Sequence, residues 1–598
     1  MAERTFGWIQ DSGSFSNLKK ILKAMQINST FNRDLQQKIL IYVPNRYRQQ
    51  ELFDALDNDE FAYNDLKGKG VGAQLTIEEN MRMFGYSKDE ASKIVAKGGR
   101  GNAACTGIAQ LCLQAQKNLP NGTKKPYQGD WQADGFIRLG VSLGFITYYR
   151  VKDTCKLSNL GVEFVNAIDD SQEEKDIIGK ALLTYPPACR VLELLDKHGH
   201  LTKFEIGSQL GFTGESGFTS IPQNIFVSGY CMETDPAEKI RIRQNTEGTS
   251  DKYARMIGAW FKSIGWVTEA PKEVTETYLG VEYSMSIGQS FALTLKGKQN
   301  IKGILGGSSV SSSEKIVFRD MLATCASDRE YLRNRRAFIL DCLSTPKTIE
   351  QIQTFLKSKG FDEDEVTIED DIKNFENIGL HVKFDSDKYK LLDTIVSLEI
   401  PKRFTTQKSN SLVEKDIIRR KLHNIDHKYL ILMDLAYDSN SNREFEIETM
   451  SLLTEQLQYR GSHLGGASKP DGVFYYDSDG VIVDTKAYSK GYSLPISQAD
   501  EMIRYIEENK ARGSINPNEW WKAFSNNPNN FSYLFVSSEF TGGYQDRLDY
   551  IKRRTSYDGA VITAENLLLF AEKVLSRDIS YKDSFDILRQ NKQVEFAI

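Results

Sequence analysis

The chain of 598 residues lacks several features that would assign it to a protein class at once. It has no run of about eighteen apolar residues, which a membrane-spanning helix needs, and its first twenty residues contain no signal-peptide core. Its seven cysteines include no CxxC pair, which argues against a structural zinc site and favours a reducing compartment. We therefore expect a cytoplasmic protein without a membrane partner.

An excess of positive charge is also absent. Lysine and arginine number 76 and aspartate and glutamate 81, for a net charge of −5, whereas nucleic-acid-binding proteins usually carry a basic surface. Basic clusters do occur locally, at residues 241–243, 333–336 and 419–421, and an acidic run spans residues 362–371. Such clusters most often cover a solvated helix face. Charge therefore neither requires nor excludes nucleic acid as a partner.

What the sequence does contain is one pattern that occurs three times. It consists of a helical stretch, a glycine and two strands, with the glycines at Gly144, Gly265 and Gly379. The pattern is found in residues 134–161, 251–297 and 368–394. This is the second half of a winged helix, a fold that commonly places one helix in the DNA major groove, although some winged helices contact only proteins. The alternative is that the three segments are alike only by chance. In all three, however, the distance from the glycine to the start of the next predicted strand is the same, which argues against chance.

These patterns and the length of the chain predict several domains. We expect three α+β subdomains of the winged-helix or helix-turn-helix kind, then a polar linker, then an α/β domain. The boundaries are residues 1–170, 171–305 and 306–396 for the subdomains, 397–412 for the linker and 413–598 for the last domain.

The segment KPDGVFYYDSDGVIVDTKAY, residues 469–488, places charged side chains at the end of an apolar strand. Alternation along the strand puts Asp484 and Lys486 on one face. The turn sequence at residues 477–480 folds Asp471 back beside them. Paired carboxylates suit a hard cation such as Mg²⁺. The cation and the ammonium group of Lys486 could then support attack of water on a phosphodiester.

The spacing P-D-x₁₂-D-x-K is the PD-(D/E)XK pattern of nucleases. The alternative is a turn aspartate with a surface ion pair, but the position after a hairpin and at a strand end favours the nuclease. Glu446, on a predicted helix, could add a further carboxylate in or behind the metal site. Residues 413–438 look helical, which would place His423 and His427 on one face, and we interpret both as surface residues because no zincin motif is present.

Longer runs resemble the FokI-type IIS restriction endonucleases over nearly the whole chain. They include RTFGWIQ at residues 4–10, HLTKFEIGSQLGFTGESGFTS at 200–220, EGTSDKYARMIGAW at 247–260 and the stretch 459–521 around the nuclease pattern. The resemblance implies a bacterial protein whose first half binds an asymmetric DNA site, with the third subdomain engaged in protein contacts. It also implies a PD-(D/E)XK domain that cuts both strands at a fixed distance, and a cognate DNA methyltransferase.

The same resemblance assigns roles to residues of the last domain. The catalytic positions fall on Asp471, Asp484 and Lys486, with Mg²⁺ held by the two aspartates. One domain carries one such site, so cutting two strands requires a transient homodimer of cleavage domains, whose contact falls on Asp500 and Arg504. Their i,i+4 spacing puts them on one helix face, and without the resemblance it would suggest only an intrahelical salt bridge. A tethered nuclease should also stay docked on the third subdomain until specific DNA is bound.

The resemblance further assigns base-reading positions to the first two subdomains. They are Gln10 and Asp11 in the N-terminal arm, Arg100, Gln116 and Trp131 in the first subdomain, and Gln244, Glu247, Lys252 and Arg255 in the second. Arginine, glutamine and glutamate suit guanine, adenine and cytosine respectively, and an aromatic ring can meet a thymine methyl group. Asp11 departs from the asparagine of the family, and Thr246 departs from its tryptophan. The expected recognition sequence is GGATG.

Two other functions compete with a Mg²⁺-dependent type IIS endonuclease, and the first belongs to another class. A DNA-binding regulator could use a nuclease-like domain only for dimerisation, but Asp471, Asp484 and Lys486 are all retained, which argues against it. A structure-specific repair nuclease is disfavoured because three winged-helix units suit sequence readout better than junction shape. We therefore predict the restriction endonuclease.

Overall fold

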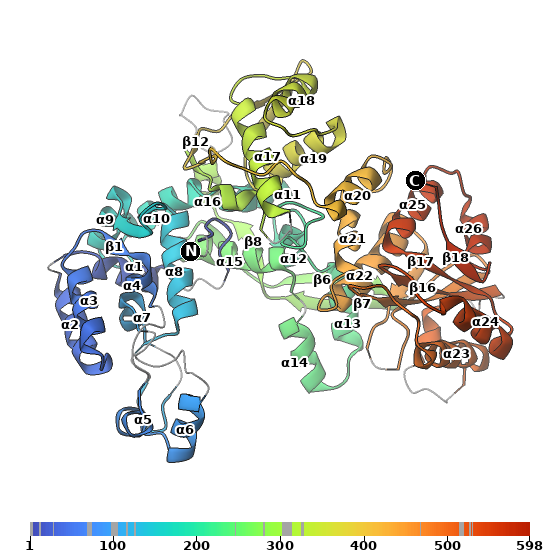
Figure 1. Cartoon of the computed structure of the whole chain (residues 1–598), viewed down its shortest axis with the longest axis horizontal. Coiled ribbons are helices and arrows are strands. Elements are labelled where there is room, and N and C mark those ends of the chain that lie inside the picture. Colours follow the sequence, from blue (N-terminus) through green and yellow to red (C-terminus); the bar gives the residue numbers. More distant parts are fainter. Residues whose placement is uncertain are drawn as a thin grey trace.

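The computed structural model describes most of the chain. The described residues are 4–10, 14–27, 29–68, 75–96, 106–114, 118–124, 127–245, 247–278, 281–301, 314–324, 328–466, 468–513, 519–524, 528 and 530–597. Figure 1 shows the first part of the chain at the left end, the second part in the middle, the third above it, and the C-terminal domain at the right end. Within the ranges just given, no helix is long and apolar enough to cross a membrane.

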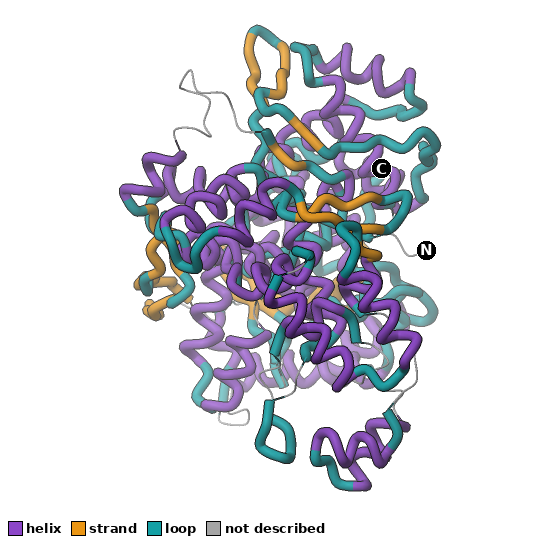
Figure 2. The backbone as a smooth tube through the Cα atoms, turned by 90° about the vertical axis from the view of Figure 1, so that its left-hand side faces the viewer, coloured by secondary structure: helices purple, strands orange, loops and turns teal. Residues whose placement is uncertain are grey.

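The first part of the chain is mainly helical, as the side view in Figure 2 shows. Its elements are α1 (Phe15–Ala24), α2 (Thr30–Tyr42), α3 (Arg46–Leu56), β1 (Phe61–Ala62), α4 (Tyr63–Lys67), α5 (Ile77–Phe84), α6 (Lys88–Ala96), α7 (Ile108–Cys112), α8 (Asp130–Ser142), β2 (Ile146–Tyr149), β3 (Thr154–Leu157) and α9 (Asn159–Asn166). The strands β2 and β3 form an antiparallel hairpin directly after α8. Helices α5 and α6 project from the body of the molecule (Figure 1).

The second part carries a longer insert between its strands. Its elements are α10 (Gln172–Leu183), α11 (Pro186–His198), β4 (Leu201–Thr202), α12 (Lys203–Gly207), α13 (Gln223–Met232), α14 (Pro236–Asn245), α15 (Thr249–Ser263), β5 (Val267–Glu269), β6 (Lys272–Tyr278), β7 (Val281–Ile287), β8 (Ser290–Leu293) and α16 (Leu295–Ile301). Strand β5 pairs with β8, and the insert between them is the separate β6–β7 ribbon.

The third part is smaller. It comprises β9 (Lys315–Ile316), a 3₁₀ turn (Arg319–Leu322), α17 (Arg329–Cys342), α18 (Ile349–Ser358), α19 (Glu365–Asn377), β10 (Val382–Asp385), β11 (Lys388–Leu391) and β12 (Ile395–Val396). One continuous apolar core, from Phe6 to Leu412, joins all three N-terminal parts.

The thrice-repeated pattern is confirmed in the backbone. Helices α8, α15 and α19 each end two residues before a glycine, and Gly144, Gly265 and Gly379 have φ values of +74°, +77° and +90°. Glycine suits this left-handed position because it carries no Cβ atom. A paired strand follows each time, which makes α8, α15 and α19 the equivalents of a winged-helix recognition helix.

The C-terminal domain is built on a six-stranded mixed sheet with the order β13-β14-β15-β16-β17-β18. Its elements are α20 (Asn410–Arg419), α21 (Leu432–Leu435), α22 (Asn442–Ser451), β13 (Arg460–His463), β14 (Gly472–Tyr476), β15 (Asp479–Lys486), α23 (Ile496–Ala511), β16 (Asn530–Ser537), α24 (Tyr544–Thr555), β17 (Gly559–Thr563), α25 (Ala564–Leu575), α26 (Tyr581–Ile587) and β18 (Lys592–Val594). Strands β13 to β15 run antiparallel, and β15 to β18 run parallel.

Helices cover both faces of this sheet, which explains the apolar run at its centre. Val481 and Val483 of β15 pack into the core formed with α20, α21, α22, α25 and α26. Ile482, between them, packs into the other core, formed with α23 and α24. A strand buried on both faces is apolar at successive positions. The fold class predicted from the sequence is therefore confirmed, with three winged-helix-like parts before an α/β domain.

The prediction that residues 413–438 form one helix is wrong. Helix α20 ends at Arg419, and α21 begins only at Leu432. The carboxylate of Glu572 on α25 accepts the backbone N–H groups of Asn424 and Ile425, which takes these donors out of any helix. His423 and His427 therefore do not share a helix face.

A histidine fixes the third part against the second. His381 contacts Glu193 of α11 through Nε2, and its Nδ1 lies 3.1 Å from Oδ2 of Asp393. Burial alone would lower the pKa of His381, but the two carboxylates outweigh it and raise the pKa to about 9. The protonated imidazolium therefore stabilises the folded protein.

We expect the free energy of unfolding to fall as the pH rises from 6.5 to about 9. The contribution of His381 is complete below its unfolded pKa of 6.5 and is lost above about 9, a difference on the order of 3 kcal/mol. Urea unfolding of the wild type and of His381→Gln at pH 6, 7.5 and 9.5 measures it. The variant should be less stable at pH 6 and nearly equal at pH 9.5. An equal deficit at all three pH values would contradict this account.

Candidate functional site

The β14–β15 hairpin determines where the acidic side chains lie. Its turn is short, because Tyr476 already pairs with Asp479, and Asp477 in the turn has a φ of +51°. Gly472 pairs with Val483, so the next residue outward on each strand is an aspartate, Asp471 on one and Asp484 on the other. The side-chain positions thus follow from strand register.

The structure brings Asp471, Asp484 and Lys486 together. Lys486 Nζ lies 2.8 Å from Oδ1 of Asp484 and 4.0 Å from Oδ2 of Asp471. Thr485 donates its backbone N–H to Oδ2 of Asp471 at 2.6 Å and its hydroxyl at 3.1 Å. Asp484 is buried, whereas 22% of the Lys486 side chain is exposed. One carboxylate is therefore held by the lysine and the other by the backbone.

Electrostatics in this cluster favour an additional cation. Burial, the charge of Asp484 and the charge of Glu446 raise the pKa of Asp471 well above its usual value. Burial also raises the pKa of Asp484, although Lys486 opposes this effect. Burial would lower the pKa of Lys486, but the two aspartates raise it. The raised pKa values show that two ionised aspartates beside one lysine are unfavourable in this desolvated place, and a bound cation would favour their ionised form.

A divalent metal ion fits this donor set. Asp471 and Asp484 offer only oxygen atoms, which hard cations prefer, and a cation would relieve the repulsion between the two carboxylates. In the described part of the chain, no group of three or more His, Cys, Asp or Glu side chains is arranged to hold a metal ion. Water and substrate oxygens would therefore complete the coordination, as is usual for Mg²⁺.

Two more carboxylates border the cluster. Glu446 on α22 lies 3.4 Å from Nε2 of His463, and its charge contributes to the raised pKa of both aspartates. Glu501 on α23 also raises the pKa of Asp484 and accepts the hydroxyl of Tyr505 at 2.9 Å. The sequence indicated Glu446 but not Glu501. No local signal marks Glu501, because only the packing of α23 against the sheet brings it near β15.

The predicted dimer residues lie on the surface of α23. Arg504 pairs within its own helix, with Glu501 at 3.1 Å and Glu508 at 3.8 Å. Asp500 accepts the hydroxyl of Tyr550 on α24 at 2.9 Å. Both side chains are exposed, and among the described residues they do not pair with each other. Both side chains are therefore accessible to a second protein molecule.

Two predicted base-reading residues flank one cleft. Gln10 and Trp131 line an opening of about 380 Å³ between the N-terminal arm and α8. Trp131 is 77% exposed at the start of α8, which is unusual for so large an apolar side chain. Asp11, Arg100 and Gln116 lie outside the described residues. Gln244 belongs to α14, but its side chain is likewise outside the described part.

The remaining base-reading candidates lie at or next to α15. Glu247 accepts Lys203 Nζ at 2.9 Å and Arg255 Nε at 3.0 Å. Burial would raise the pKa of Glu247, but these cations lower it. Lys252 and Arg255 line a second cleft, beside the exposed face of α15. The candidates are therefore neighbours, and Arg255 already has a partner in the free protein.

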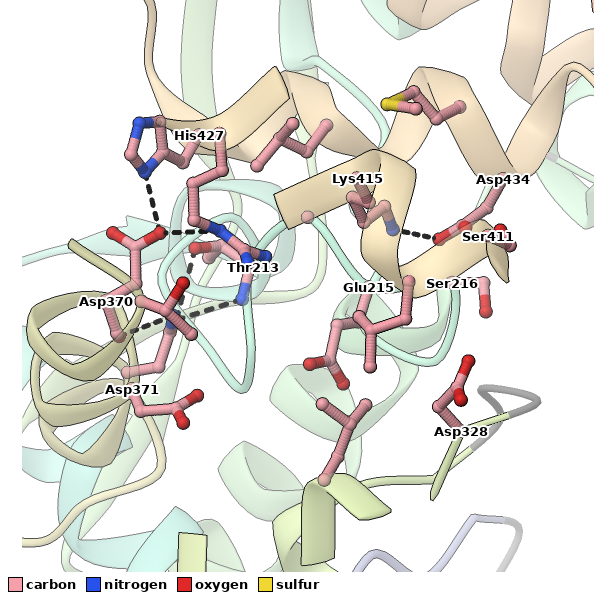
Figure 3. Close-up of a pocket in the computed structure, with 18 of the residues that line it drawn as sticks. Thr213, Glu215, Ser216, Asp328, Asp370, Asp371, Ser411, Lys415, His427 and Asp434 are labelled. Carbon is pink, nitrogen blue, oxygen red and sulfur yellow. Dashed lines mark hydrogen bonds and ion pairs between the residues drawn. The ribbon is translucent and has the colours of Figure 1, made fainter. Parts of the chain in front are cut away.

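The C-terminal domain docks on the third part through paired charges. Lys408 bridges Glu363 and Asp416 at 2.8 and 2.6 Å. His427 Nδ1 lies 2.6 Å from Oδ2 of Asp370, which Arg419 Nε also approaches at 3.2 Å. Figure 3 shows this contact at the edge of a cavity of about 530 Å³ between the second part, the third part and the C-terminal domain. His427 is thus an interface residue, and its interpretation as a surface residue is wrong.

Comparisons with known proteins assign the chain to a family. Models for FokI match residues 4–167 (recognition domain, subdomain 1), 174–309 (recognition domain, subdomain 2), 322–387 (D3 domain) and 407–595 (cleavage domain). The type II restriction enzyme FokI of Planomicrobium okeanokoites is 38% identical over 97% of both chains. The chain belongs to the FokI family.

Further relatives agree with this assignment. The type II restriction enzyme StsI of Streptococcus sanguinis is 30% identical, over 76% of this chain and 78% of its own. Two solved structures, of FokI alone and of FokI bound to DNA, match 99% of this chain at 37% identity with TM-scores of 0.87 and 0.86. Members of this family are type II restriction enzymes, which are site-specific deoxyribonucleases that use a divalent metal ion. The chain is therefore an enzyme acting on DNA, and the non-catalytic regulator is ruled out.

Proposed function

We propose that this FokI-family enzyme is a type IIS restriction endonuclease that binds GGATG and hydrolyses both DNA strands at a fixed distance outside it. The observation that carries the proposal is the convergence of Asp471, Asp484 and Lys486 at the end of β15, in a chain whose first half contains three winged-helix-like parts. The enzyme would act in the bacterial cytoplasm beside a DNA methyltransferase that protects the same sequence.

In this proposal Asp471 and Asp484 hold Mg²⁺, which supplies Lewis-acid stabilisation of the phosphate when bound. Lys486 keeps its proton near the attacked phosphorus and offsets the negative charge that develops there. Thr485 fixes the orientation of Asp471 through two hydrogen bonds. Glu446 lies behind Asp471 and orients the site through His463 rather than reacting itself.

Recognition would use the arm and the two recognition helices α8 and α15. One part of the site would be contacted by Gln10 and Asp11 of the arm and by Arg100, Gln116 and Trp131 of the first subdomain. Gln244, Glu247, Lys252 and Arg255 face the other part. Arg255 would exchange Glu247 for guanine when DNA binds, since its guanidinium can pair with either.

Two strands would be cut by two copies of the cleavage domain. Asp500 and Arg504 on the exposed surface of α23 supply opposite charges, so that two copies related by a twofold axis can pair Asp500 of each with Arg504 of the other.

The direct experiment is digestion of two plasmids that differ only in one GGATG site. With Mg²⁺, the plasmid that contains the site should be linearised and the other should remain intact. Equal cutting of both plasmids would contradict the proposed specificity, and no cutting of either would contradict the proposed activity.

We further propose that the charged contacts around Asp370 keep the cleavage domain docked before DNA binds. Burial would lower the pKa of His427, but the charge of Asp370 raises it, so the imidazolium that pairs with Asp370 is favoured while the domains are docked. Asp370→Asn should weaken docking and increase the radius of gyration in small-angle scattering. Asp387→Asn, an exposed aspartate of the same part, is the control. Identical scattering from all three proteins would contradict the proposal.

A further inference from the structure

The cleft over α15 has a second wall, to which no role has been assigned. It has a volume of about 540 Å³ and lies between the start of α1, the start of α10 and the exposed face of α15. Lys252 and Arg255 of α15 form one wall, and Lys20, Lys23 and Lys175 of α1 and α10 contribute to the other. The two walls thus bring cations from the first and second parts of the chain into one cleft.

The lysines of the second wall differ in whether their charge is satisfied. Lys19 is buried and donates to the carbonyl oxygen of Ala167 at 2.6 Å and to Asp169 and Glu174 at 2.7 Å each. These three acceptors use all three of its donors, so Lys19 serves to fix α1 against α10. Lys23 is partly neutralised, because Asp169 lies 3.6 Å from its ammonium group.

Lys20 and Lys175 carry unneutralised charge. Within the described ranges, the one hydrogen bond of Lys20 Nζ is to the amide oxygen of Asn17, at 3.4 Å. Among the residues that the structure describes, no carboxylate lies within ion-pair distance of either Lys20 or Lys175. Both nevertheless face the same cleft as Lys252 and Arg255.

Carboxylates also line this cleft, but Asp169 and Glu174 pair with Lys19, and Glu269 pairs with Lys262, which leaves Asp170 as the other one. The ammonium groups of Lys20 and Lys175 are therefore suited to bind an anionic ligand.

We propose that Lys20 and Lys175 bind phosphate groups of the DNA strand that borders the major groove entered by α15. A recognition helix in the major groove lies between two phosphate backbones, and cations beside the helix contact those phosphates. Lysine binds phosphate as a point charge without reading a base. Lys20 and Lys175 are therefore positioning residues that fix the register of α15 on DNA. The inference rests on the proposed function, since it requires that α15 enters the major groove.

Salt dependence of DNA binding tests this assignment. Each phosphate contact contributes about −0.9 to the slope of log K against log salt concentration. The affinity for a 30-base-pair duplex is measured by fluorescence anisotropy in EDTA, from about 50 to 300 mM salt. The slope should be less steep than that of the wild type by about 0.9 for Lys20→Ala and for Lys175→Ala. It should be less steep by about 1.8 for the double variant. Each single variant should bind about tenfold more weakly at 0.1 M salt.

Two controls separate phosphate contacts from other effects. Lys180→Ala removes an exposed charge from the same helix α10 outside the cleft, and its slope should remain that of the wild type. The ratio of affinities for a GGATG duplex and a scrambled duplex should be unchanged in Lys20→Ala and Lys175→Ala and reduced in Arg255→Ala.

The possible failures are distinguishable. A wild-type slope in the double variant, or an equal decrease in Lys180→Ala, would overturn the assignment while leaving the proposed function standing. Failure of the unaltered protein to bind either duplex would overturn the proposed function as well. Thermal unfolding of each variant should match that of the wild type, since Lys20 is exposed and pairs with no carboxylate in the part of the chain that the structure describes. A change in slope would then not come from misfolding.

Discussion

Replacing Asp484 with alanine is expected to abolish DNA cleavage while leaving specific DNA binding within about twofold of the wild type. Among the described residues, Asp484 and Asp471 are the carboxylates that pair with Lys486 at the end of β15. Loss of Asp484 would remove a proposed metal ligand together with the ion pair at 2.8 Å. Loss of one electrostatic element of a preorganised site reduces the rate by about a thousandfold or more. The DNA-reading residues lie in other parts of the chain, so affinity should be preserved.

The measurement is single-turnover cleavage of a plasmid, together with a gel-shift titration in EDTA. Asp484→Asn retains the shape of the side chain and should be as inactive as the alanine variant, which separates chemistry from folding. Asp578→Asn makes the same substitution at an exposed carboxylate of the same domain and should cut normally. Normal cleavage by Asp484→Ala would show that the site has been assigned to the wrong residues.

Replacing Arg504 with aspartate is expected to slow double-strand cleavage at least about tenfold at low enzyme concentration. The substitution places two like charges, Asp500 and the new carboxylate, on the same exposed surface of α23. Like charges across a twofold contact repel, so two cleavage domains would pair less readily. DNA binding should not change, because α23 belongs to the cleavage domain alone.

A dependence on concentration distinguishes this effect from damage to the active site. The deficit of Arg504→Asp should shrink as the enzyme concentration rises, since dimerisation is bimolecular. Lys582→Asp reverses an exposed charge on α26, which packs on the other face of the sheet, and should cut at the wild-type rate. If Arg504→Asp cleaves normally at low concentration, the cleavage domains do not pair through this surface.

Those features of the site that depend on neighbouring residues could be predicted from the sequence. Strand alternation places Asp484 and Lys486 on one face, and a short turn determines that Asp471 returns beside them. The three glycines after α8, α15 and α19 were equally predictable, because glycine is the residue that most often follows a helix in the left-handed conformation. Local rules of this kind need no knowledge of the tertiary fold.

Features that depend on distant partners were missed or misjudged. His427 was interpreted as a surface residue because its partner, Asp370, lies 57 positions away in another part of the chain. The helix predicted over residues 413–438 is interrupted because Glu572 accepts the backbone N–H of Asn424, and Glu572 belongs to the distant helix α25. Glu501 approaches Asp484 only through the packing of α23 on the sheet. Tertiary contacts override local preference in each case.

The most direct test of the central claim is sequencing of the DNA ends produced when this enzyme digests unmethylated genomic DNA with Mg²⁺. The account predicts that every end lies at one fixed distance, per strand, from a single asymmetric sequence, GGATG, and that Asp484→Asn produces no such ends. The account would be contradicted if the cuts fell inside the recognition sequence, or if the DNA next to the ends had no sequence in common.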